Sequence, residues 1–197
     1  DDDTDSGVSY EIEIEKSIMV PMRDGVMLST DLYMPKGADG DLGTILMRDP
    51  YDKNVATSAG HEYRFELLMS FVRRGFVVAI QDIRGRFESE GRYLPGKSNR
   101  DDGYDTVTWL TDQPWSNDRL ATFGCSYTGD TQVILATARH PKHVAAAPMA
   151  STTGYYAHGR PWVSFDGGAF ELAQTAGWFS RSGPEVFYGP PAWVDRQ

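Results

Sequence analysis

The sequence predicts an α/β fold with a doubly wound, mostly parallel sheet that has antiparallel strands on its N-terminal side. Residues 76–80 form an apolar run without alternation, which is typical of a parallel strand covered on both faces. Such runs alternate with segments of helical periodicity, and this order favours a parallel sheet with helices between its strands. Residues 10–22 instead alternate apolar and acidic side chains, as a half-buried strand does.

The N-terminal residues are predicted to form a hairpin followed by a central strand. In residues 10–22 the isoleucines face one side and the glutamates the other, which favours a strand at the edge of the sheet. The turn at 23–25 leads into a returning strand over 26–33, which ends before Pro35 and a glycine-rich loop. Residues 44–47 are apolar, and we expect them to form a central strand.

A helix is predicted over residues 61–74, because four apolar side chains recur at helical spacing before Gly75 ends the pattern. These side chains are Phe65, Leu68, Met69 and Val72. Strands and helices then continue to alternate along the chain. We expect a strand at 76–80, a loop at 84–98, a helix at 101–111, a strand at 120–123, a helix to about residue 139 and a strand at 144–147.

Three regions of the chain differ in composition. Residues 1–9 are acidic, and we expect a mobile N-terminus there. Residues 10–150 carry the α/β pattern and are long enough to form a domain with a substantial core. From 151 to 197 the sequence is rich in aromatic residues, glycine and proline, which predicts an inserted lid or the beginning of a cap rather than more of the sheet.

The composition argues against several kinds of partner. The net charge is −9, from 28 acidic and 19 basic side chains, which disfavours binding to nucleic acid or to an anionic membrane. No stretch reaches the roughly 18 to 20 consecutive apolar residues of a membrane helix. The single cysteine leaves the compartment open between the cytoplasm and a secreted or periplasmic location with the signal already removed.

No sequence pattern predicts a metal or a cofactor. A glycine-rich phosphate loop and a dinucleotide-binding fingerprint are both absent from the sequence. His140 and His143 lack nearby cysteines or clustered carboxylates, so a surface helix end is favoured over a metal pair. Asp101 and Asp102 are expected to be solvated at the start of helix 101–111, which Asp102 or a neighbour would cap.

Ser126 lies where an apolar strand passes through small residues directly into a helix. This layout is typical of a nucleophile elbow, a sharp turn that projects a serine hydroxyl beyond the sheet. Gly124 and Thr128 flank the serine at positions −2 and +2, where small side chains let strand and helix approach each other. With Cys125 as the nucleophile, Phe123 would occupy position −2 and collide, so we interpret Cys125 as a buried spacer.

Five separate segments resemble the N-terminal part of the cocaine esterase (CocE/NonD) family of α/β-hydrolases, which is related to the Xaa-Pro dipeptidyl-peptidases and the α-amino-acid ester hydrolases. The segments occur in the family's order and are Val20–Leu28, Arg48–Lys53, Gln81–Gly85, Gln113–Ser116 and Gly124–Gly129. The resemblance implies that residues 10–150 are the N-terminal part of an α/β-hydrolase domain and that 151–197 begin a helical cap.

The resemblance also implies roles for five residues. Ser126 would attack an ester or amide carbonyl, while the backbone N–H of Tyr127 and the hydroxyl of Tyr51 would hold the oxyanion. Trp162 and Trp178 match cap positions at which the family's tryptophans line the substrate pocket. Aromatic faces can hold apolar acyl groups or, by cation–π attraction, an amine. The alternative is that both tryptophans only pack the cap.

A serine nucleophile needs a histidine oriented by a carboxylate, and no suitable pair follows the elbow in this chain. His140 and His143 lie at the far end of the helix that the elbow begins, ~20 Å from the serine at 1.5 Å per residue. His158 has the right place in the order, but no strand of the sheet precedes it. Asp82 comes before the serine, and we interpret it as a buried partner of Arg84.

The resemblance accounts for this gap, because family members supply the acid and the histidine from a later part of the chain. We therefore expect the N-terminal part of a larger enzyme, processed or cut down, whose partner is a complementary C-terminal chain; a homo-oligomer also stays open. The expected function is that of a serine hydrolase that cleaves esters or amides of small acyl groups. The alternatives are an Xaa-Pro dipeptidyl-peptidase, a β-lactam acylase or α-amino-acid ester hydrolase, and, from another class, a non-catalytic α/β binding module.

Overall fold

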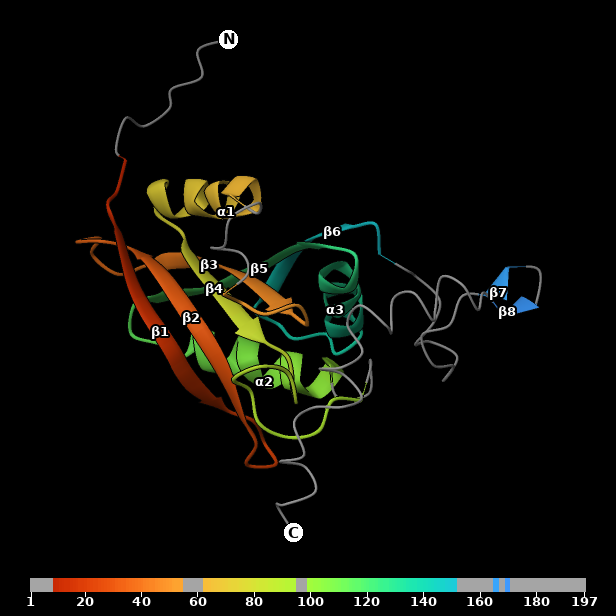
Figure 1. Ribbon diagram of the computed structural model, residues 1–197. Coiled ribbons are helices and arrows are strands. Elements are labelled where there is room, and N and C mark those ends of the chain that lie inside the picture. Colours follow the sequence, from red (N-terminus) through yellow and green to blue (C-terminus); the bar gives the residue numbers. More distant parts are fainter. Residues whose placement is uncertain (1–8, 55–61, 95–98, 152–164, 167–168, 171–197) are drawn as a thin grey trace.

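A computed structural model of the protein describes residues 9–54, 62–94, 99–151, 165–166 and 169–170 (Figure 1). Within these ranges, a six-stranded sheet carries three helices. The strands of this sheet are β1 (Ile12–Pro21), β2 (Met27–Pro35), β3 (Leu42–Asp49), β4 (Val77–Asp82), β5 (Ser116–Cys125) and β6 (His143–Met149). The helices are α1 (Glu62–Arg73), α2 (Asn99–Thr111) and α3 (Tyr127–Ala136). A separate two-stranded sheet consists of β7 (Phe165–Asp166) and β8 (Ala169–Phe170).

The large sheet has the strand order β1-β2-β4-β3-β5-β6. The pairs β1–β2 and β2–β4 are antiparallel, and the pairs from β4 through β3 and β5 to β6 are parallel. Strands and helices alternate along the chain from β3 to β6, as crossover connections between parallel strands require. The predicted α/β sheet with antiparallel strands at its N-terminal side is therefore confirmed.

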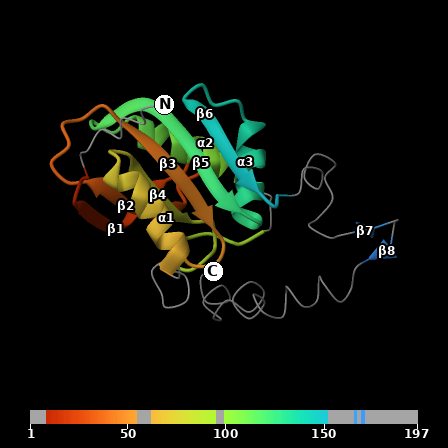
Figure 2. The same cartoon turned by 90° about the horizontal axis from the view of Figure 1, so that it is seen from above.

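Helices cover both faces of the sheet (Figure 2). On one face, Leu68 and Val72 of α1 pack on the strands, and on the other Val107 of α2 and Leu135 of α3 do so. The central strand β4 is buried at every residue. This two-sided burial explains why the sequence of β4 is apolar without alternation.

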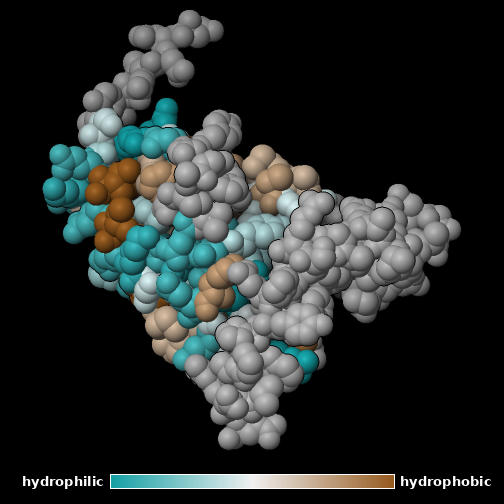
Figure 3. All heavy atoms as spheres, in the orientation of Figure 1, coloured by the Kyte–Doolittle hydropathy of each residue, from teal (hydrophilic) through white to brown (hydrophobic). Residues whose placement is uncertain are grey.

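The edge strand β1 follows the predicted alternation only in part. A bulge between Glu15 and Ile18 changes its register with β2. Val20 is fully buried, but Ile14 is 48 % exposed, and Figure 3 shows an apolar patch over the first half of β1. The described part of the chain leaves the Ile14 side chain uncovered, so the expectation of a buried isoleucine stripe is wrong at this position.

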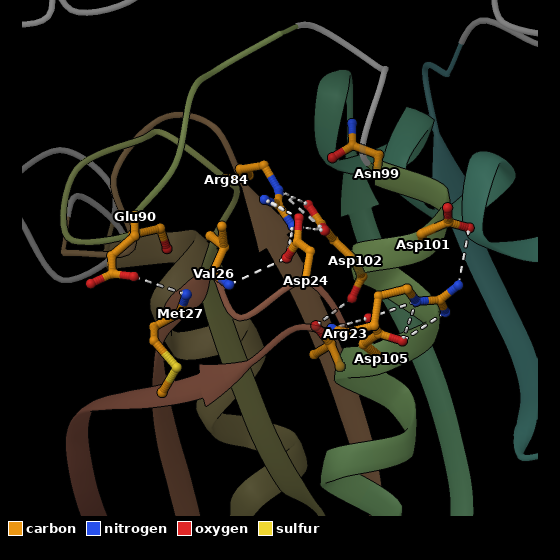
Figure 4. Close-up of polar contacts among 12 residues, drawn as sticks. Arg23, Asp24, Val26, Met27, Arg84, Glu90, Asn99, Asp101, Asp102 and Asp105 are labelled. Atoms are coloured by element: carbon orange, nitrogen blue, oxygen red, sulfur yellow. Dashed lines mark hydrogen bonds and ion pairs between the residues drawn. The ribbon is translucent and has the colours of Figure 1, made fainter. Parts of the chain in front are cut away.

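Ion pairs fasten the turn of the β1–β2 hairpin to α2 (Figure 4). Arg84, just after β4, binds Asp24 in the turn at 2.8 Å and Asp102 in α2 at 2.6 Å. Arg23 in the same turn binds Asp105 at 2.7 Å. Asp102 is consequently buried, and the expectation that it is a solvated helix start is wrong.

Several expectations fall largely outside the described residues. Only Ser9 of the expected mobile segment 1–9 is described, and only Ser151, β7 and β8 of the expected cap 151–197. Both domain assignments stay predictions. None of the helices in the described ranges is long and apolar enough to cross a membrane.

Candidate active site

Tyr51 and Ser126 meet at one end of the sheet because they follow neighbouring parallel strands. β3 ends at Asp49 and β5 ends at Cys125, and the two strands pair in parallel. The carboxyl ends of parallel strands lie at the same edge, which is where open α/β sheets carry their ligand sites. The Tyr51 hydroxyl lies 3.5 Å from Ser126 Oγ.

The main chain at Ser126 makes the sharp turn of an elbow. Its φ is 63° and its ψ is −127°, in a region that costs a non-glycine residue about 1–3 kcal/mol. The Ser126 N–H donates to the carbonyl of Met149 at 2.9 Å, and the Ser126 carbonyl accepts from Gly129 at 2.8 Å. The side chain is exposed and makes no capping bond to α3. The hydroxyl is therefore accessible, although its predicted role as nucleophile remains a prediction.

Two glycines make this turn sterically possible. A Cβ at Gly124 would collide with the side chain of Thr128, whose own Cβ would lie only 2.6 Å away. A Cβ at Gly129 would lie 2.7 Å from the carbonyl oxygen of Met149 on β6. Glycine at these positions lets α3 begin directly beside the ends of β5 and β6.

Two polar side chains of α3 secure the elbow. Thr128 Oγ1 donates to the carbonyl of Cys125 at 2.8 Å. Gln132 Nε2 donates to the carbonyl of Gly124 at 3.2 Å, while Gln132 Oε1 accepts from the N–H of Ala147 on β6 at 3.1 Å. Sequence reasoning missed Gln132, and its position between polar residues and the apolar run 133–136 gave no signal of this role.

Cys125 is exposed, so the interpretation of this residue as a buried spacer is wrong. Side chains alternate along β5, with Leu120, Thr122 and Gly124 buried. Cys125 points to the opposite face at the very end of the strand, where no described residue covers it. The steric argument against Cys125 as the nucleophile is unaffected.

Tyr127 turns its side chain into the interior. Its phenol is 1 % exposed, and its oxygen accepts a hydrogen bond from Asn99 Nδ2 at 3.1 Å. Only its main-chain amide, at the first residue of α3, can therefore serve the predicted oxyanion site. That amide lies at the positive end of the helix dipole, which favours a developing negative charge.

The loop that carries Tyr51 is fixed on both sides of the tyrosine. The Tyr51 N–H donates to Asp49 Oδ1 at 2.8 Å, and Arg86 Nε donates to the carbonyl of Pro50 at 2.7 Å. On the other side, the N–H of Lys53 donates to Asp82 Oδ1 at 2.8 Å. The ring of Tyr51 is half-buried against a small aromatic and aliphatic cluster.

Asp82 is buried as predicted, but its partner is Lys53 rather than Arg84. Arg84 binds Asp24 and Asp102 instead, because the hairpin turn and α2 bring two carboxylates to it. Burial raises the pKa of Asp82 to about 7, although the hydrogen bond from the Lys53 N–H opposes this rise. A carboxyl so engaged belongs to the structure of the loop.

Lys53 lies at the centre of a buried ionic cluster. Its ammonium is 2.6 Å from Glu88 Oε2, 3.3 Å from Asp31 Oδ1 and 4.0 Å from Asp82 Oδ2. The side chains of Lys53, Asp31 and Asp82 are fully buried. Burial by itself lowers the pKa of Lys53, but the bond to Glu88 and the other carboxylates raise it overall. The same bond lowers the pKa of Glu88 to about 2.

Neither described histidine that follows the serine can reach it. His143 pairs with Leu120 at the opposite end of β5, roughly 17 Å along the strand from the elbow. His140 is only 7 % exposed and packs against α2, where its Nε2 is 3.0 Å from Thr108 Oγ1. The expectation of a surface helix end is therefore wrong for His140, because α2 covers it. Burial lowers the pKa of both imidazoles.

The other predicted site residues cannot be placed. His158, Trp162 and Trp178 lie outside the described residues. Over the described ranges, no group of three histidine, cysteine or acidic side chains could hold a metal ion. The part of the site that is described consists of the serine, its elbow and the tyrosine opposite.

Comparison with known proteins identifies relatives of this chain. Residues 24–192 match the sequence profile of the X-Pro dipeptidyl-peptidase (S15 family). The cocaine esterase of Rhodococcus sp. (strain MB1 Bresler) is 40 % identical over 172 residues, which are 86 % of this chain and 29 % of that protein. The chain thus spans less than a third of the length of this relative.

Solved structures of hydrolases also match this chain over part of their length. An α-amino acid ester hydrolase superposes with a TM-score of 0.64 at 30 % identity, covering 77 % of this chain and 28 % of its own. A CocE/NonD family hydrolase from Staphylococcus aureus superposes with a TM-score of 0.73 at 25 % identity, covering 91 % of this chain and 34 % of its own. The described sheet matches one part of these larger α/β proteins.

Proposed function

Since the chain belongs to the X-Pro dipeptidyl-peptidase (S15) family, we propose that it is the nucleophile-bearing part of a serine hydrolase. The proposed reaction is cleavage of an ester or amide bond in a small substrate. The observation that carries the proposal is the 3.5 Å distance between the hydroxyls of Ser126 and Tyr51. The Ser126 hydroxyl projects from an elbow, and the Tyr51 hydroxyl faces it from the loop after the neighbouring strand β3. Acyl transfer needs a nucleophile and an oxyanion donor close together in this way.

The proposed reaction has two steps on Ser126. In the first, Ser126 Oγ gives up its proton and attacks the carbonyl carbon, and the bond to the alcohol or amine breaks as the leaving group takes up a proton. In the second, water attacks the acyl-enzyme, releases the acid and restores the hydroxyl. In both steps the carbonyl oxygen becomes negative, and the Tyr51 hydroxyl and the Tyr127 N–H are the proposed donors to it. One such donor contributes about 3 kcal/mol to transition-state stability.

The proton relay is proposed to come from the remainder of a longer polypeptide. α/β-Hydrolases place the acid and the histidine after the serine, on the strands that follow in the sheet. β6 is an edge strand whose residues 144–149 are all exposed, and an unpaired edge of this kind accepts another strand. The proposed partner is thus a C-terminal segment or chain that extends the sheet beyond β6 and brings the histidine to Ser126.

The substrate is proposed to be a small ester or amide held partly by the cap. Trp162 and Trp178 are the proposed pocket residues, and an amine or an apolar acyl group suits their aromatic faces. An acyl esterase, an Xaa-Pro dipeptidyl-peptidase and a β-lactam acylase are the candidate activities. Turnover of p-nitrophenyl acyl esters, Gly-Pro-anilide and a β-lactam amide by the assembled protein separates these three.

Labelling with a fluorophosphonate probe tests the proposal. Such a probe phosphonylates an activated serine, so peptide mass analysis of the assembled protein is expected to find the adduct on Ser126. The S126A variant is the control and is expected to stay unlabelled. A folded, assembled protein that takes up no probe would instead be a non-catalytic α/β binding module.

A further inference from the structure

The burial of the Lys53 ammonium calls for an explanation. A buried charge is costly unless partners compensate it, and apolar side chains of similar volume often stabilise a protein as well. Here the partners come from three separate places in the chain. Asp31 lies on β2, Asp82 ends β4 and Glu88 belongs to the loop after β4. Lys53 therefore joins the Tyr51 loop to two strands and to a second loop.

Lys53 is held by its main chain as well as by its side chain. Its N–H donates to Asp82 Oδ1 while its ammonium faces Asp82 Oδ2, so one carboxylate grips both ends of the residue. Glu88 is itself held in place, because Ser17 Oγ and Ser29 Oγ donate to the same oxygen that binds the ammonium. The anchor is thus rigid on both sides of the ion pair.

The anchor lies two residues from the tyrosine that faces the serine. Asp52 alone separates the two residues and has a φ of 87°, so the position of Lys53 constrains the short turn that carries Tyr51. On the other side, Arg86 holds the carbonyl of Pro50. The phenol is therefore placed by a short segment fixed at both ends, and Lys53 is the only charged side chain of residues 50–53 that is buried.

Resting on the hydrolase function proposed above, we infer that Lys53 is a positioning residue for the oxyanion tyrosine. Its ammonium, clamped by Asp31, Asp82 and Glu88, holds the loop so that the Tyr51 hydroxyl stays opposite Ser126 Oγ. The ammonium is given no role in proton transfer, because it is buried among Asp31, Asp82 and Glu88 and is not directed at the Ser126 hydroxyl. Lys53 acts on the reaction only through Tyr51.

A double-mutant cycle with Tyr51 tests this inference in the assembled enzyme. K53M is expected to lower kcat about tenfold with less than about a twofold change in KM, because only transition-state stabilisation is lost. In the Y51F background, K53M is expected to change kcat by less than about twofold. Equal losses in both backgrounds, or an unchanged kcat in K53M alone, would overturn the inference.

The control and a second variant guard against simple unfolding. Lys36 forms an exposed ion pair with Glu11 at 3.0 Å, so K36M removes a lysine far from the cluster and is expected to leave kcat unchanged. E88Q keeps the shape of Glu88 but weakens the clamp, and it is expected to show the same pattern as K53M with a smaller loss of kcat. Melting curves identify the temperature at which every variant is folded.

A second measurement needs no turnover and separates this inference from the function on which it rests. The 13Cζ NMR resonance of Tyr51, assigned with Y51F, reports the position of the phenol directly. It is expected to shift or broaden in K53M and E88Q but not in K36M. If the probe fails to label Ser126 while the resonance still responds to K53M, the hydrolase proposal fails and the positioning role stands. An unmoved resonance in both variants overturns the positioning role.

Discussion

Different kinds of interaction hold the two parts of the candidate site, the Ser126 elbow and the Tyr51 loop. Ser126 sits on an elbow that steric fit and neutral hydrogen bonds fix, with Gly124 against Thr128 and Gln132 bridging to β6. Tyr51 sits on a loop that charges fix, chiefly through Lys53. We expect the position of the proposed nucleophile to depend on steric fit and neutral hydrogen bonds, and that of the proposed oxyanion donor to respond to charge and pH. The five predictions that follow test this contrast, from the largest expected effect to the smallest.

The largest effect is expected for Gly124→Ala. The added methyl would collide with the Thr128 side chain at the start of α3 and would strain a backbone with φ 151°, and overpacking of this kind destabilises by up to about 3 kcal/mol. Denaturant unfolding measures this loss. The control is G37A, at an exposed turn with nothing within 4 Å, where only backbone strain of about 1 kcal/mol is expected. Equal losses in the two variants would show that the elbow is not sterically fixed.

A large loss of activity, without a comparable loss of stability, is expected for Tyr51→Phe. Removing one oxyanion donor costs about 3 kcal/mol of transition-state stabilisation, or ~10²-fold in kcat. KM is expected to change little, because the charge develops only in the transition state. Steady-state kinetics of the assembled enzyme measures both constants. An unaltered kcat would remove Tyr51 from the site.

The pH dependence of stability is expected to report Asp82. Because burial raises its pKa from 3.8 to about 7, the folded chain keeps a proton that the unfolded chain has lost over this range. The contribution of Asp82 to the free energy of unfolding therefore falls as the pH rises from about 4 to about 7, and then levels off. D82N is expected to flatten that slope, as measured by urea unfolding between these pH values.

The contribution of Glu88 to stability is expected to change with pH in the opposite direction to that of Asp82. The bond to Lys53 lowers the pKa of Glu88 from 4.5 to about 2, so its contribution to stability is present above pH 4.5 and is lost as the pH falls towards 2. E88Q is expected to remove this acid-side loss and leave the slope of Asp82 in place. Wild-type slopes retained in both variants would contradict the assignment of these slopes to Asp82 and Glu88.

The smallest effect is expected for Cys125→Ala. The side chain is exposed at the end of β5, so the substitution is expected to change the free energy of unfolding by less than about 0.5 kcal/mol. Turnover is expected to persist, in contrast to S126A. A loss of activity in C125A as large as that in S126A would reopen the question of which residue is the nucleophile.

Local sequence predicted what local geometry determines. The elbow follows from the small residues around Ser126, and β4 follows from an apolar run that only two-sided burial explains. Tyr51 was predicted from the resemblance alone, and its position opposite Ser126 is explained by neighbouring parallel strands that end at one edge of the sheet. These features depend on contacts between near neighbours or on the topology of the fold as a whole.

What could not be predicted depends on tertiary partners. Asp102 is buried because Arg84 reaches it across 18 positions of sequence, and His140 is buried because α2 lies over it. The clamp on Lys53 combines residues from β2, β4 and a loop, and no local pattern links them. The sequence therefore predicted the places of Ser126 and Tyr51 better than those of the charged groups around them.

A structure of the fluorophosphonate adduct of the assembled protein tests the central claim most directly. The account predicts a bond from Ser126 Oγ to phosphorus, with the phosphoryl oxygen accepting hydrogen bonds from the Tyr51 hydroxyl and the Tyr127 N–H at about 2.7–3.1 Å. An adduct on another residue, or a phosphoryl oxygen directed away from Tyr51, would contradict it.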